Sequence, residues 1–500
     1  MATSVFVVVI PLVPALAWGA ADARKGRRAK ELLLMAYAAV GLLDSISEFC
    51  RRAGMAESTF GRRAVNDGKF VARLRDGARI TPETLERVSA FLTTRGVAAP
   101  ASPPELKPLL RVQAAGAPQA KAPAEEQPSR NFRFFDNRQK YLLFVNTCSE
   151  KEVIARRVGM ELAHLHPEPP AVRVFDAGRG DGTLLTRVLR DMHRRFPTLP
   201  FYVVGKEISL EDTRLSLDKM ADRFHEHPAT VLVVTNMYYT EAPWLAPNAV
   251  SAATSLAWHE VALTGSTGAE FSEQIAALEP LLARVWQARH SPKTGNPVYE
   301  RPAAIVIYRE DFRFLLDDVV PRQGRARADY DLIIASQPYR ARVPVAFKAS
   351  RVVSPLARAL RPGGRLLGIH SCGRDPGLEI IRKIWPEEDP FQTSRHDILR
   401  ATRAELGRDA RHYNFNAYAD QRAVFRYDMH TLPSEIAASI GTSTLFAAWN
   451  AAVYVAQIDD ERLGQVLGER KYLDATREVL QTHGRLWFLD ESYVISRKRG

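Results

Sequence analysis

Apolar runs alternate with helical segments through the middle of the chain. Four runs rich in Val, Ile, Leu and Phe read VRVFD at 172–176, FYVVGKEI at 201–208, ATVLVVT at 229–235 and DLIIA at 331–335. An amphipathic segment follows the first run, and LARALRPGG precedes a fifth run that ends at Ser371. Uniformly apolar strands separated by helices predict an α/β fold, a parallel sheet with helices on both faces.

The two ends of the chain have different patterns. Residues 42–92 are typical of four short helices, SISEFCRRAG, MAESTFGRRAV, DGKFVARLRDG and TPETLERVSAFL. Near the other end, AAVYVAQI at 451–458 and WFLDESYVIS at 487–496 are apolar and predict the last two strands of the sheet. Residues 414–445, which precede these two runs, are dense in Tyr, His, Asp and Asn, which suit either a substrate pocket or ordinary polar loops.

These patterns predict four segments in 500 residues, a length that exceeds one compact core. They are an apolar then basic leader at 1–34, a small all-α domain at 35–95, an Ala/Pro-rich linker at 96–130 and the α/β domain at 131–500. The α/β domain contains an insertion at about 239–328 and an extended C-terminal part.

Cysteine content and the N-terminal leader bear on the cellular compartment of the protein. Three cysteines without a C-x-x-C pair exclude a disulfide framework or a thiolate zinc site, and no other metal site is predicted. The leader has an apolar stretch at 5–21 followed by basic residues, the reverse of a secretory signal. It is a mis-assigned start, with the chain beginning near Met35, or a membrane anchor, or a cleaved signal. The first two place the α/β domain in the cytoplasm, in the second case anchored at the inner membrane.

The most specific motif is D-A-G-R-G-D-G, in which Asp176 ends the first run and glycines alternate at Gly178, Gly180 and Gly182. Glycines at this place allow positive φ and let a ligand approach the backbone. The spacing G-x-G-x-G differs from the G-x-G-x-x-G of dinucleotide sites.

The motif resembles motif I of the class I S-adenosylmethionine-dependent methyltransferases. The resemblance implies a Rossmann-like sheet, S-adenosylmethionine as cofactor, and binding by Asp176 and the three glycines. It also implies that Glu207, at the end of the second run, holds the ribose hydroxyls, and that Asn236, after the third, bonds the adenine. The acceptor of the methyl group is unidentified: a small molecule, a lipid, a protein or DNA.

The resemblance leaves two candidates for the fourth strand. Residues 331–335 are preferred, because their distance to the R-P-G-G segment is the usual one in the family. The alternative is 251–263, within the insertion, where another apolar run, 303–310, also lies.

Where the acceptor carries a proton, methyl transfer uses a base, and the candidates are His259, Glu260 and His370. After the preferred fourth strand comes Ser336-Gln337-Pro338-Tyr339. It resembles the D/N/S-P-P-Y/F motif of amino-group DNA methyltransferases, in which the aromatic, here Tyr339, stacks on a flipped base. Gln337 stands where that motif has its first proline. The lead-in FFDNRQKYLLF at 134–144 has aromatics that either cover the cofactor or belong to the core.

The helices at 42–92 resemble phage-repressor-like helix-turn-helix modules. The resemblance implies DNA as a partner of this domain, contacted by a recognition helix with Ser58, Thr59, Arg62 and Arg63. The alternative is a helical bundle used for docking. The chain has a formal net charge of +12, which permits an acidic partner or a membrane surface, the latter through residues 5–21. A regulator that binds both S-adenosylmethionine and DNA without turnover is the remaining alternative to an enzyme.

Overall fold

The chain divides into two compact units, Met1–Glu125 and Glu126–Gly500. The computed structural model describes residues 138–499 except 292–296, 432, 437–439, 467 and 469. In the first unit it describes 46–47, 49–51, 53, 55–75, 84, 87–88 and 91. The predicted leader and linker lie outside the described residues. Within the described part, no helix is both long and apolar enough to cross a membrane.

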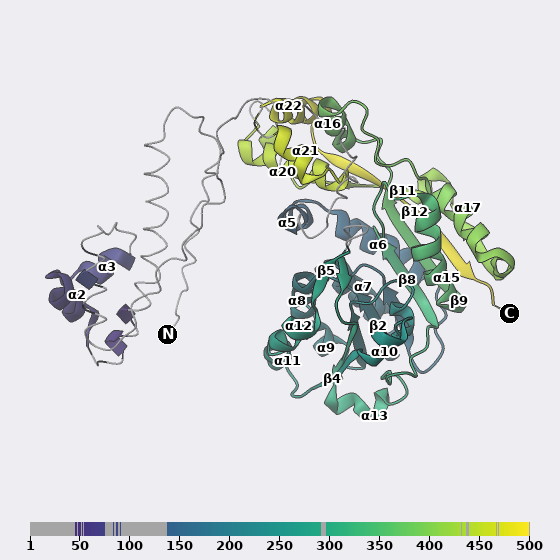
Figure 1. Ribbon diagram of the computed structural model, residues 1–500, viewed down its shortest axis with the longest axis horizontal. Helices are drawn as coiled ribbons and strands as arrows, with labels where there is room; N and C mark the ends of the chain where they lie inside the picture. Colours follow the sequence, from purple (N-terminus) through teal and green to yellow (C-terminus); the bar gives the residue numbers. More distant parts are fainter. Residues whose placement is uncertain are drawn as a thin grey trace, which may run out of the picture. The chain divides into compact units, whose positions relative to one another are not determined.

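The second unit is built on a ten-stranded sheet of order β10-β12-β9-β8-β1-β2-β3-β7-β4, with β11 also paired to β12 (Figure 1). Its parallel centre consists of β3 (Thr230–Thr235), β2 (Phe201–Lys206), β1 (Val172–Asp176), β8 (Tyr330–Ser336) and β9 (Leu360–Ser371). Antiparallel strands extend both ends of it: β7 (Ala303–Arg309) on β3, and β12 (Trp487–Arg497) on β9. The outer strands are β4 (Ala257–Leu263) beside β7, and β10 (Tyr413–Asn416) and β11 (Val424–Asp428) beside β12.

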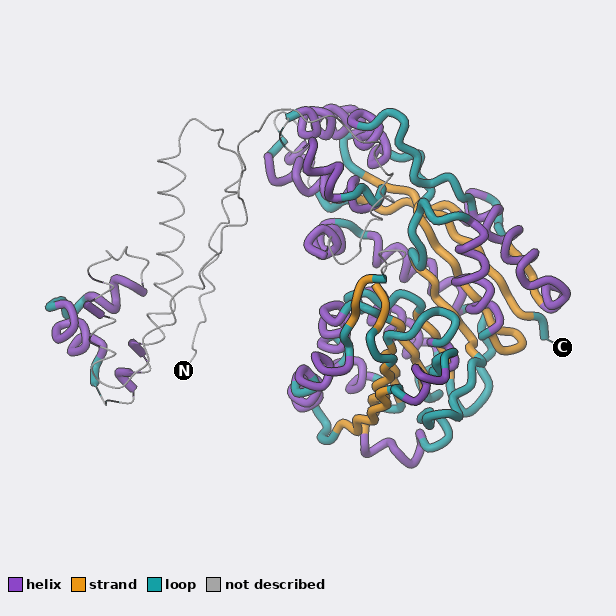
Figure 2. Tube along the Cα trace, viewed as in Figure 1, coloured by secondary structure: helices purple, strands orange, loops and turns teal. Residues whose placement is uncertain are grey.

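Helices cover both faces of the sheet, which confirms the predicted α/β fold (Figure 2). Alternate residues of β1 and β2 belong to two separate cores, as the two-residue period of a strand requires. The first core is closed by α6 (Glu150–Leu162), α7 (Thr183–Arg195), α8 (Leu210–Asp218), α9 (Ala221–Glu226), α11 (Gly268–Ala276) and α12 (Glu279–Val285). The second is closed by segments that include α15 (Ser354–Arg358) and α17 (Arg395–Leu406).

The preferred fourth strand has the predicted place. β8 contains residues 331–335 and pairs in parallel with both β1 and β9, and all seven of its residues are buried. The alternative segment, 251–263, divides into α10 (Val250–Thr254) and β4. β4 is an outer strand with a partly exposed pattern, so it lies at the edge of the sheet.

One strand prediction is wrong. Residues 451–455 of the run AAVYVAQI belong to α20 (Thr442–Val455). This helix packs against α5 (Arg138–Thr147), α16 (Pro376–Ile384) and α22 (Lys471–His483) in a third core, so its apolar residues face helices on several sides. A short run that is apolar on all sides does not distinguish a buried helix from a buried strand. The prediction at 487–496 is confirmed by β12.

The first unit contains α2 (Glu57–Val65) and α3 (Phe70–Arg75), joined by a turn in which Asn66 has a φ of 59°. Phe49, Phe60 and Phe91 pack edge to face in its core. The short turn leaves little room at Gly61, where a Cβ would lie 2.3 Å from the Asp67 carbonyl oxygen.

Candidate functional site

The candidate site lies at the carboxyl ends of the central strands. The chain leaves β1 between its two parallel neighbours, β2 on one side and β8 on the other. The sheet order changes direction there, and α/β folds of this kind bind ligands in the crevice at that position. The predicted glycine loop is the segment that follows β1.

Two of the loop glycines adopt a left-handed conformation, with φ of 52° at Gly180 and 80° at Gly182. A Cβ on Gly182 would lie 2.7 Å from the Cβ of Ser216 on α8, so this glycine lets the loop pack on the helix. A Cβ on Gly178 would meet only the Ser336 carbonyl oxygen, at 3.5 Å. Gly178 is therefore open toward the ligand side of the loop.

Asp176 is fully buried beneath this loop. Its Oδ1 accepts a hydrogen bond from the Gly178 N–H at 3.3 Å, whereas its Oδ2 has no hydrogen-bond partner among the described residues. Burial raises the pKa of this carboxyl to about 6, although the nearby Arg179 favours the charged form. The result is a buried acid with one unsatisfied oxygen, which a donor from outside the chain would satisfy.

Glu207 stands directly after β2 and braces the glycine loop. Its Oε2 accepts the Gly180 N–H at 2.9 Å, and its Oε1 accepts the N–H groups of Ile208 and Ser209 at 2.8 and 2.9 Å. Three backbone donors hold the carboxylate in one orientation at the wall of the cavity described below.

Asn236 is not part of that wall. Its Nδ2 donates to the Arg301 carbonyl at 2.9 Å, and its Oδ1 accepts the Ala303 N–H at 2.8 Å. Both groups of the amide are therefore engaged between β3 and β7. The amide that the family resemblance assigns to adenine is therefore bonded to the backbone at β7, a strand of the predicted insertion that pairs with β3.

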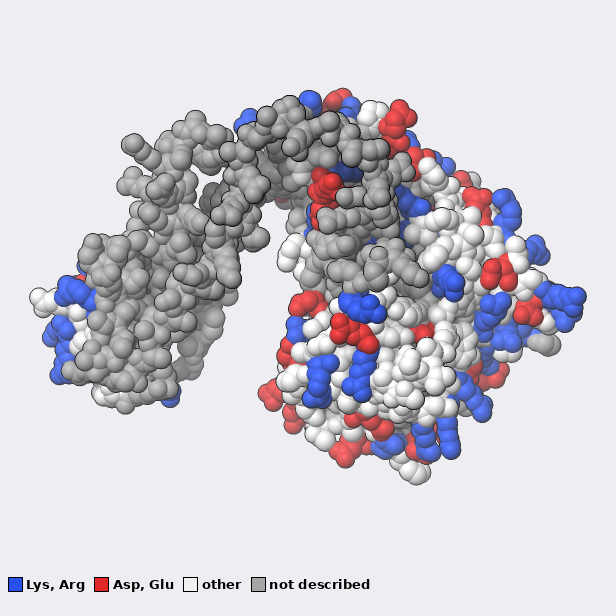
Figure 3. Space-filling model, viewed as in Figure 1, with Lys and Arg blue, Asp and Glu red and all other residues white. Residues whose placement is uncertain are grey.

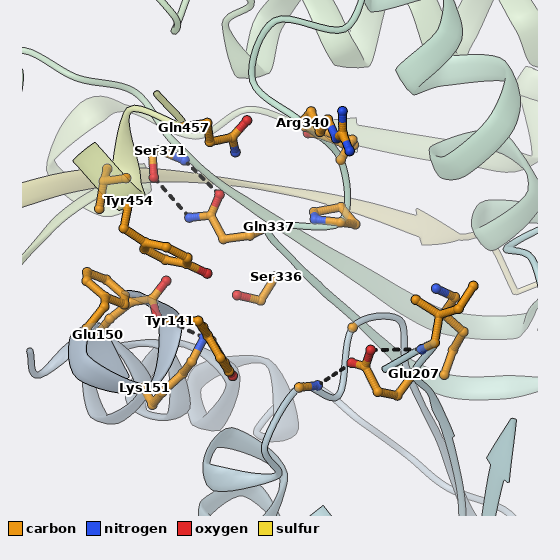
Figure 4. A pocket seen from close by; sticks show the side chains of 18 of the residues that line it. Tyr141, Glu150, Lys151, Glu207, Ser336, Gln337, Arg340, Ser371, Tyr454 and Gln457 are labelled. Carbon is orange, nitrogen blue, oxygen red and sulfur yellow. Dashed lines mark hydrogen bonds and ion pairs between the residues drawn. The ribbon is translucent and has the colours of Figure 1, made fainter. Parts of the chain in front are cut away.

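A cavity of about 210 Å³ lies over the loop (Figure 4). Gly178, Gly180 and Glu207 line one side of it, while Asp176 and Gly182 lie outside the lining. The rest of the lining, which includes the side opposite Glu207, comes from segments far apart in the sequence and contains Tyr141, Phe144, Glu150, Lys151, Ser336, Gln337, Tyr339, Ser371, Tyr427, Tyr454 and Gln457. Sequence reasoning missed Glu150, Lys151 and Tyr454, and singled out Tyr141, Phe144 and Tyr427 only within the broad stretches 134–144 and 414–445.

Tyr141 links this opposite side to the loop. Its hydroxyl donates to the Asp181 Oδ1 at 3.1 Å and accepts the Asp181 N–H at 3.3 Å. A Cβ on Gly180 would lie 2.5 Å from the same hydroxyl. The aromatic lead-in to the α/β domain thus contributes a side chain to the cavity, packed against the loop.

The Ser336–Tyr339 turn lines the cavity but differs in backbone from a Pro-Pro turn. Gln337 has a φ of 48°, which proline cannot adopt. Its Nε2 donates to the Ser371 Oγ at 3.1 Å and to both Asp490 oxygens at 3.2 and 3.3 Å, while its Oε1 accepts the Ser371 N–H at 3.2 Å. The Tyr339 hydroxyl lies 3.3 Å from that of Tyr493. The glutamine therefore anchors the turn to β9 and β12, and this geometry does not favour the amino-group DNA methyltransferase alternative.

The three predicted bases lie elsewhere. His259 and Glu260 are on β4, separated from β1 by β2, β3 and β7, and Glu260 bonds Tyr308 and Arg313. His370 is buried on β9 with its Nε2 3.1 Å from the Glu491 Oε1, behind the cavity wall. None of the three lines the cavity over the glycine loop.

In the first unit, the four predicted DNA-contacting residues share α2. Ser58, Arg62 and Arg63 are exposed and Thr59 is half-buried. Arg62 follows Ser58 by one helical turn, so both are on one face. On the visible face of the second unit, acidic and basic side chains are interspersed (Figure 3).

No family model and no curated protein matches the chain. Among solved structures, a geranyl diphosphate methyltransferase in complex with GPP and sinefungin is similar at 14% identity and a TM-score of 0.27, over 69% of this chain and 78% of that chain. A putative sarcosine dimethylglycine methyltransferase from Galdieria sulphuraria is similar at 10% identity and a TM-score of 0.26, over 70% and 86%. A loganic acid methyltransferase with SAH is similar at 11% identity and a TM-score of 0.28, over 75% and 98%. Identities and TM-scores at this level assign no function by themselves.

Proposed function

We propose that this protein transfers a methyl group from S-adenosylmethionine to an acceptor. The observation that carries the proposal is the cavity over the D-A-G-R-G-D-G loop at the point where the sheet order changes direction, with Glu207 fixed at its wall. A dinucleotide site would need a loop of different glycine spacing.

The residues fit the cofactor. Asp176 Oδ2 is buried without a partner beneath the loop, just outside the cavity lining, and the charged amine of the methionyl end is the group of the cofactor that would stabilise its ionised form. Gly178 leaves its side of the loop open, because a Cβ there would meet a single atom at ordinary contact distance. Glu207 is held by three N–H groups and presents a carboxylate that two neighbouring hydroxyls, such as those of a ribose, can share.

When bound, S-adenosylmethionine supplies an electrophilic methyl group. The chain then has to orient the acceptor, exclude water and remove a proton where the acceptor carries one. Tyr141, Phe144 and Tyr454 form a largely apolar wall for the first two tasks. S-adenosylmethionine is made in the cytoplasm, so we place the reaction there.

The test is calorimetric titration of the full-length protein with S-adenosylmethionine and S-adenosylhomocysteine. We expect micromolar binding of both, weakened at least about tenfold in Asp176→Asn, since a charge-assisted hydrogen bond contributes more than a neutral one. Asp375→Asn is the matched control, because Asp375 is also a buried acid whose pKa is raised to about 6 by burial, but it caps α16 and bonds the Leu378 and Leu489 N–H groups instead of the glycine loop. Absence of binding to the wild-type protein would refute the proposal.

A regulator that senses the cofactor would give the same titration. Release of S-adenosylhomocysteine during incubation with candidate acceptors, DNA among them, separates the two functions. Turnover supports the enzyme, and binding without turnover on any acceptor class supports the regulator.

A further inference from the structure

One end of the cavity is built from segments outside the central strands. It lies opposite Glu207, where Tyr141, Glu150 and Lys151 face Tyr454 and Ser371 (Figure 4). The glycine loop and Glu207 account for the other end. The composition of this second end therefore bears on the acceptor.

Its walls are aromatic. Phe144 lies against Tyr454 with ring centroids 4.8 Å apart, and Tyr427 meets Phe144 edge to face at 6.1 Å. Tyr141 is 5.9 Å from Tyr454. Aromatic rings arranged in this way accommodate a further ring by stacking or edge contact.

Its charges are internally balanced. Glu150 Oε2 is 2.8 Å from Lys151 Nζ, and both side chains are largely buried. Glu150 begins the 13-residue helix α6, where the free N–H groups also stabilise a negative charge. Asp490, behind Ser371 and Gln337, is fully buried, and burial together with Glu150 raises the pKa of its carboxyl well above the usual range. Because Glu150 and Lys151 already pair with each other, a charged ligand would find no counter-charge to spare at this end.

Two hydroxyls of the cavity lining are unsatisfied, that of Tyr427 beside the aromatic rings and that of Ser336 midway toward Glu207 (Figure 4). Ser336 Oγ and Tyr427 Oη are buried in side chains 7% and 1% exposed, and neither has a hydrogen-bond partner within the described part of the chain. Both residues line the cavity. Buried polar groups are rarely left unpaired, so two of them at a cavity wall indicate a ligand with polar hydrogens or lone pairs.

We propose that this end binds an uncharged, one-ring acceptor whose reacting atom carries a hydrogen, a phenolic hydroxyl or an aromatic amine, and that Glu150 accepts that hydrogen as a proton. The inference rests on the proposed function. Among the cavity-lining carboxylates, Glu207 is held by three backbone N–H groups at the opposite end, whereas Glu150 stands among the aromatic rings.

The reaction moves one methyl group to the acceptor and one proton to Glu150. A lone pair of the acceptor oxygen or nitrogen forms the new bond to the methyl carbon, and the bond from that carbon to sulfur breaks with its electron pair remaining on sulfur. Glu150 takes the proton and later releases it to solvent. Acceptors that need no base, such as carboxylates, sulfides or tertiary amines, would make no use of this carboxylate.

Three one-ring probes of different charge test the inference without turnover: phenol, benzoate and benzylamine. Each is titrated at pH 7.5 into the full-length protein saturated with S-adenosylhomocysteine. We expect phenol to bind at least about tenfold more tightly than the two charged probes, since an uncompensated buried charge is costly. Glu150→Gln should weaken phenol binding about tenfold, the effect of losing a hydrogen bond to a charged group, and leave S-adenosylhomocysteine binding unchanged.

Glu478→Gln, on the exposed face of α22, is the control and should change neither affinity. Tyr427→Phe keeps the ring, removes an unsatisfied hydroxyl and should also weaken phenol binding, which keeps the test valid if Glu150→Gln does not fold. Preference for benzoate or benzylamine, no binding of any probe, or phenol binding unaffected by these substitutions would overturn the inference while S-adenosylhomocysteine still binds. Failure of S-adenosylhomocysteine to bind the wild-type protein would instead refute the proposed function, and this inference with it.

Discussion

Asp176→Asn should make the protein relatively more stable at neutral pH while it weakens cofactor binding. Burial raises the pKa of Asp176 from 3.8 to about 6. The folded state therefore holds this proton more tightly than the unfolded state, and the stability due to it is lost as pH rises from about 4 through 6. At 1.36 kcal/mol per unit, the ionised carboxylate costs about 3 kcal/mol above pH 6.

Asparagine does not ionise and keeps an acceptor for the Gly178 N–H. Its NH₂ group stands where Oδ2 lacks a partner, which adds a cost of about 1–3 kcal/mol that does not depend on pH. The decisive quantity is therefore the change with pH. Between pH 4.5 and 7.5, the difference in unfolding free energy should move by about 2 kcal/mol in favour of the variant, the part of the 3 kcal/mol that titrates in that range.

Urea unfolding of both proteins at pH 4.5, 6 and 7.5, followed by tryptophan fluorescence, measures this difference. Asp409→Asn makes the same chemical change at an exposed position and serves as the control. Parallel curves for Asp176→Asn and the wild type would refute the reasoning, because they would mean that the carboxylate ionises freely in the folded protein. A variant with shifted stability but unchanged affinity for S-adenosylhomocysteine would show that burial raises the pKa of Asp176 and that Asp176 is not part of the cofactor site.

Other outcomes follow from the same geometry. Gly178→Ala should leave the melting temperature unchanged and weaken S-adenosylhomocysteine binding. Gly182→Ala should instead destabilise the fold by about 2–4 kcal/mol, since its Cβ would lie 2.7 Å from that of Ser216 at a φ of 80°. Calorimetry measures both quantities, and equal melting temperatures for the two variants would contradict this prediction. The affinity for S-adenosylmethionine should fall as pH drops below about 6, and binding should release a proton there, because the amine binds the ionised form of Asp176. Calorimetric titrations in buffers of different ionisation enthalpy detect the released proton. An affinity that does not change with pH would contradict the pairing of the amine with Asp176. The double variant Arg62→Ala, Arg63→Ala should bind DNA more weakly and with a smaller salt dependence, as measured by fluorescence anisotropy, while its affinity for S-adenosylhomocysteine is unchanged. If the wild-type protein binds no DNA, α2 is not a DNA-recognition helix.

The parts of the fold that could be predicted are those with local patterns. β1, β2, β3 and β8 are buried on both faces, so most of their residues are apolar and the runs are visible without knowledge of their neighbours. The glycine loop is visible because its backbone conformation excludes most side chains. The run at 451–455 failed because burial on all sides by helices produces the same apolarity as burial in a sheet.

The acceptor end of the cavity could not be predicted for a different reason. Glu150 and Tyr427 are 277 positions apart in the sequence, and the residues around each one form no motif that would mark it as part of a site. Only the third core, which brings α5, α20 and β11 together, gives them a common cavity. His259 and Glu260, the predicted bases on β4, have side chains that can accept a proton, but β4 is separated from β1 by three other strands.

Asp176 lies beneath the glycine loop and Glu150 lies among the aromatic rings of the cavity, so cofactor binding and proton transfer are assigned to different acids. Asp176 titrates near pH 6, so at neutral pH it is ionised at a cost to folding that a bound cation would offset. At the other end, Glu150 lies 2.8 Å from Lys151 among the aromatic rings, and it is the cavity-lining carboxylate to which we assign the acceptor's proton. Substitutions at Asp176 should therefore change cofactor affinity and stability together, whereas Glu150→Gln should change acceptor binding alone.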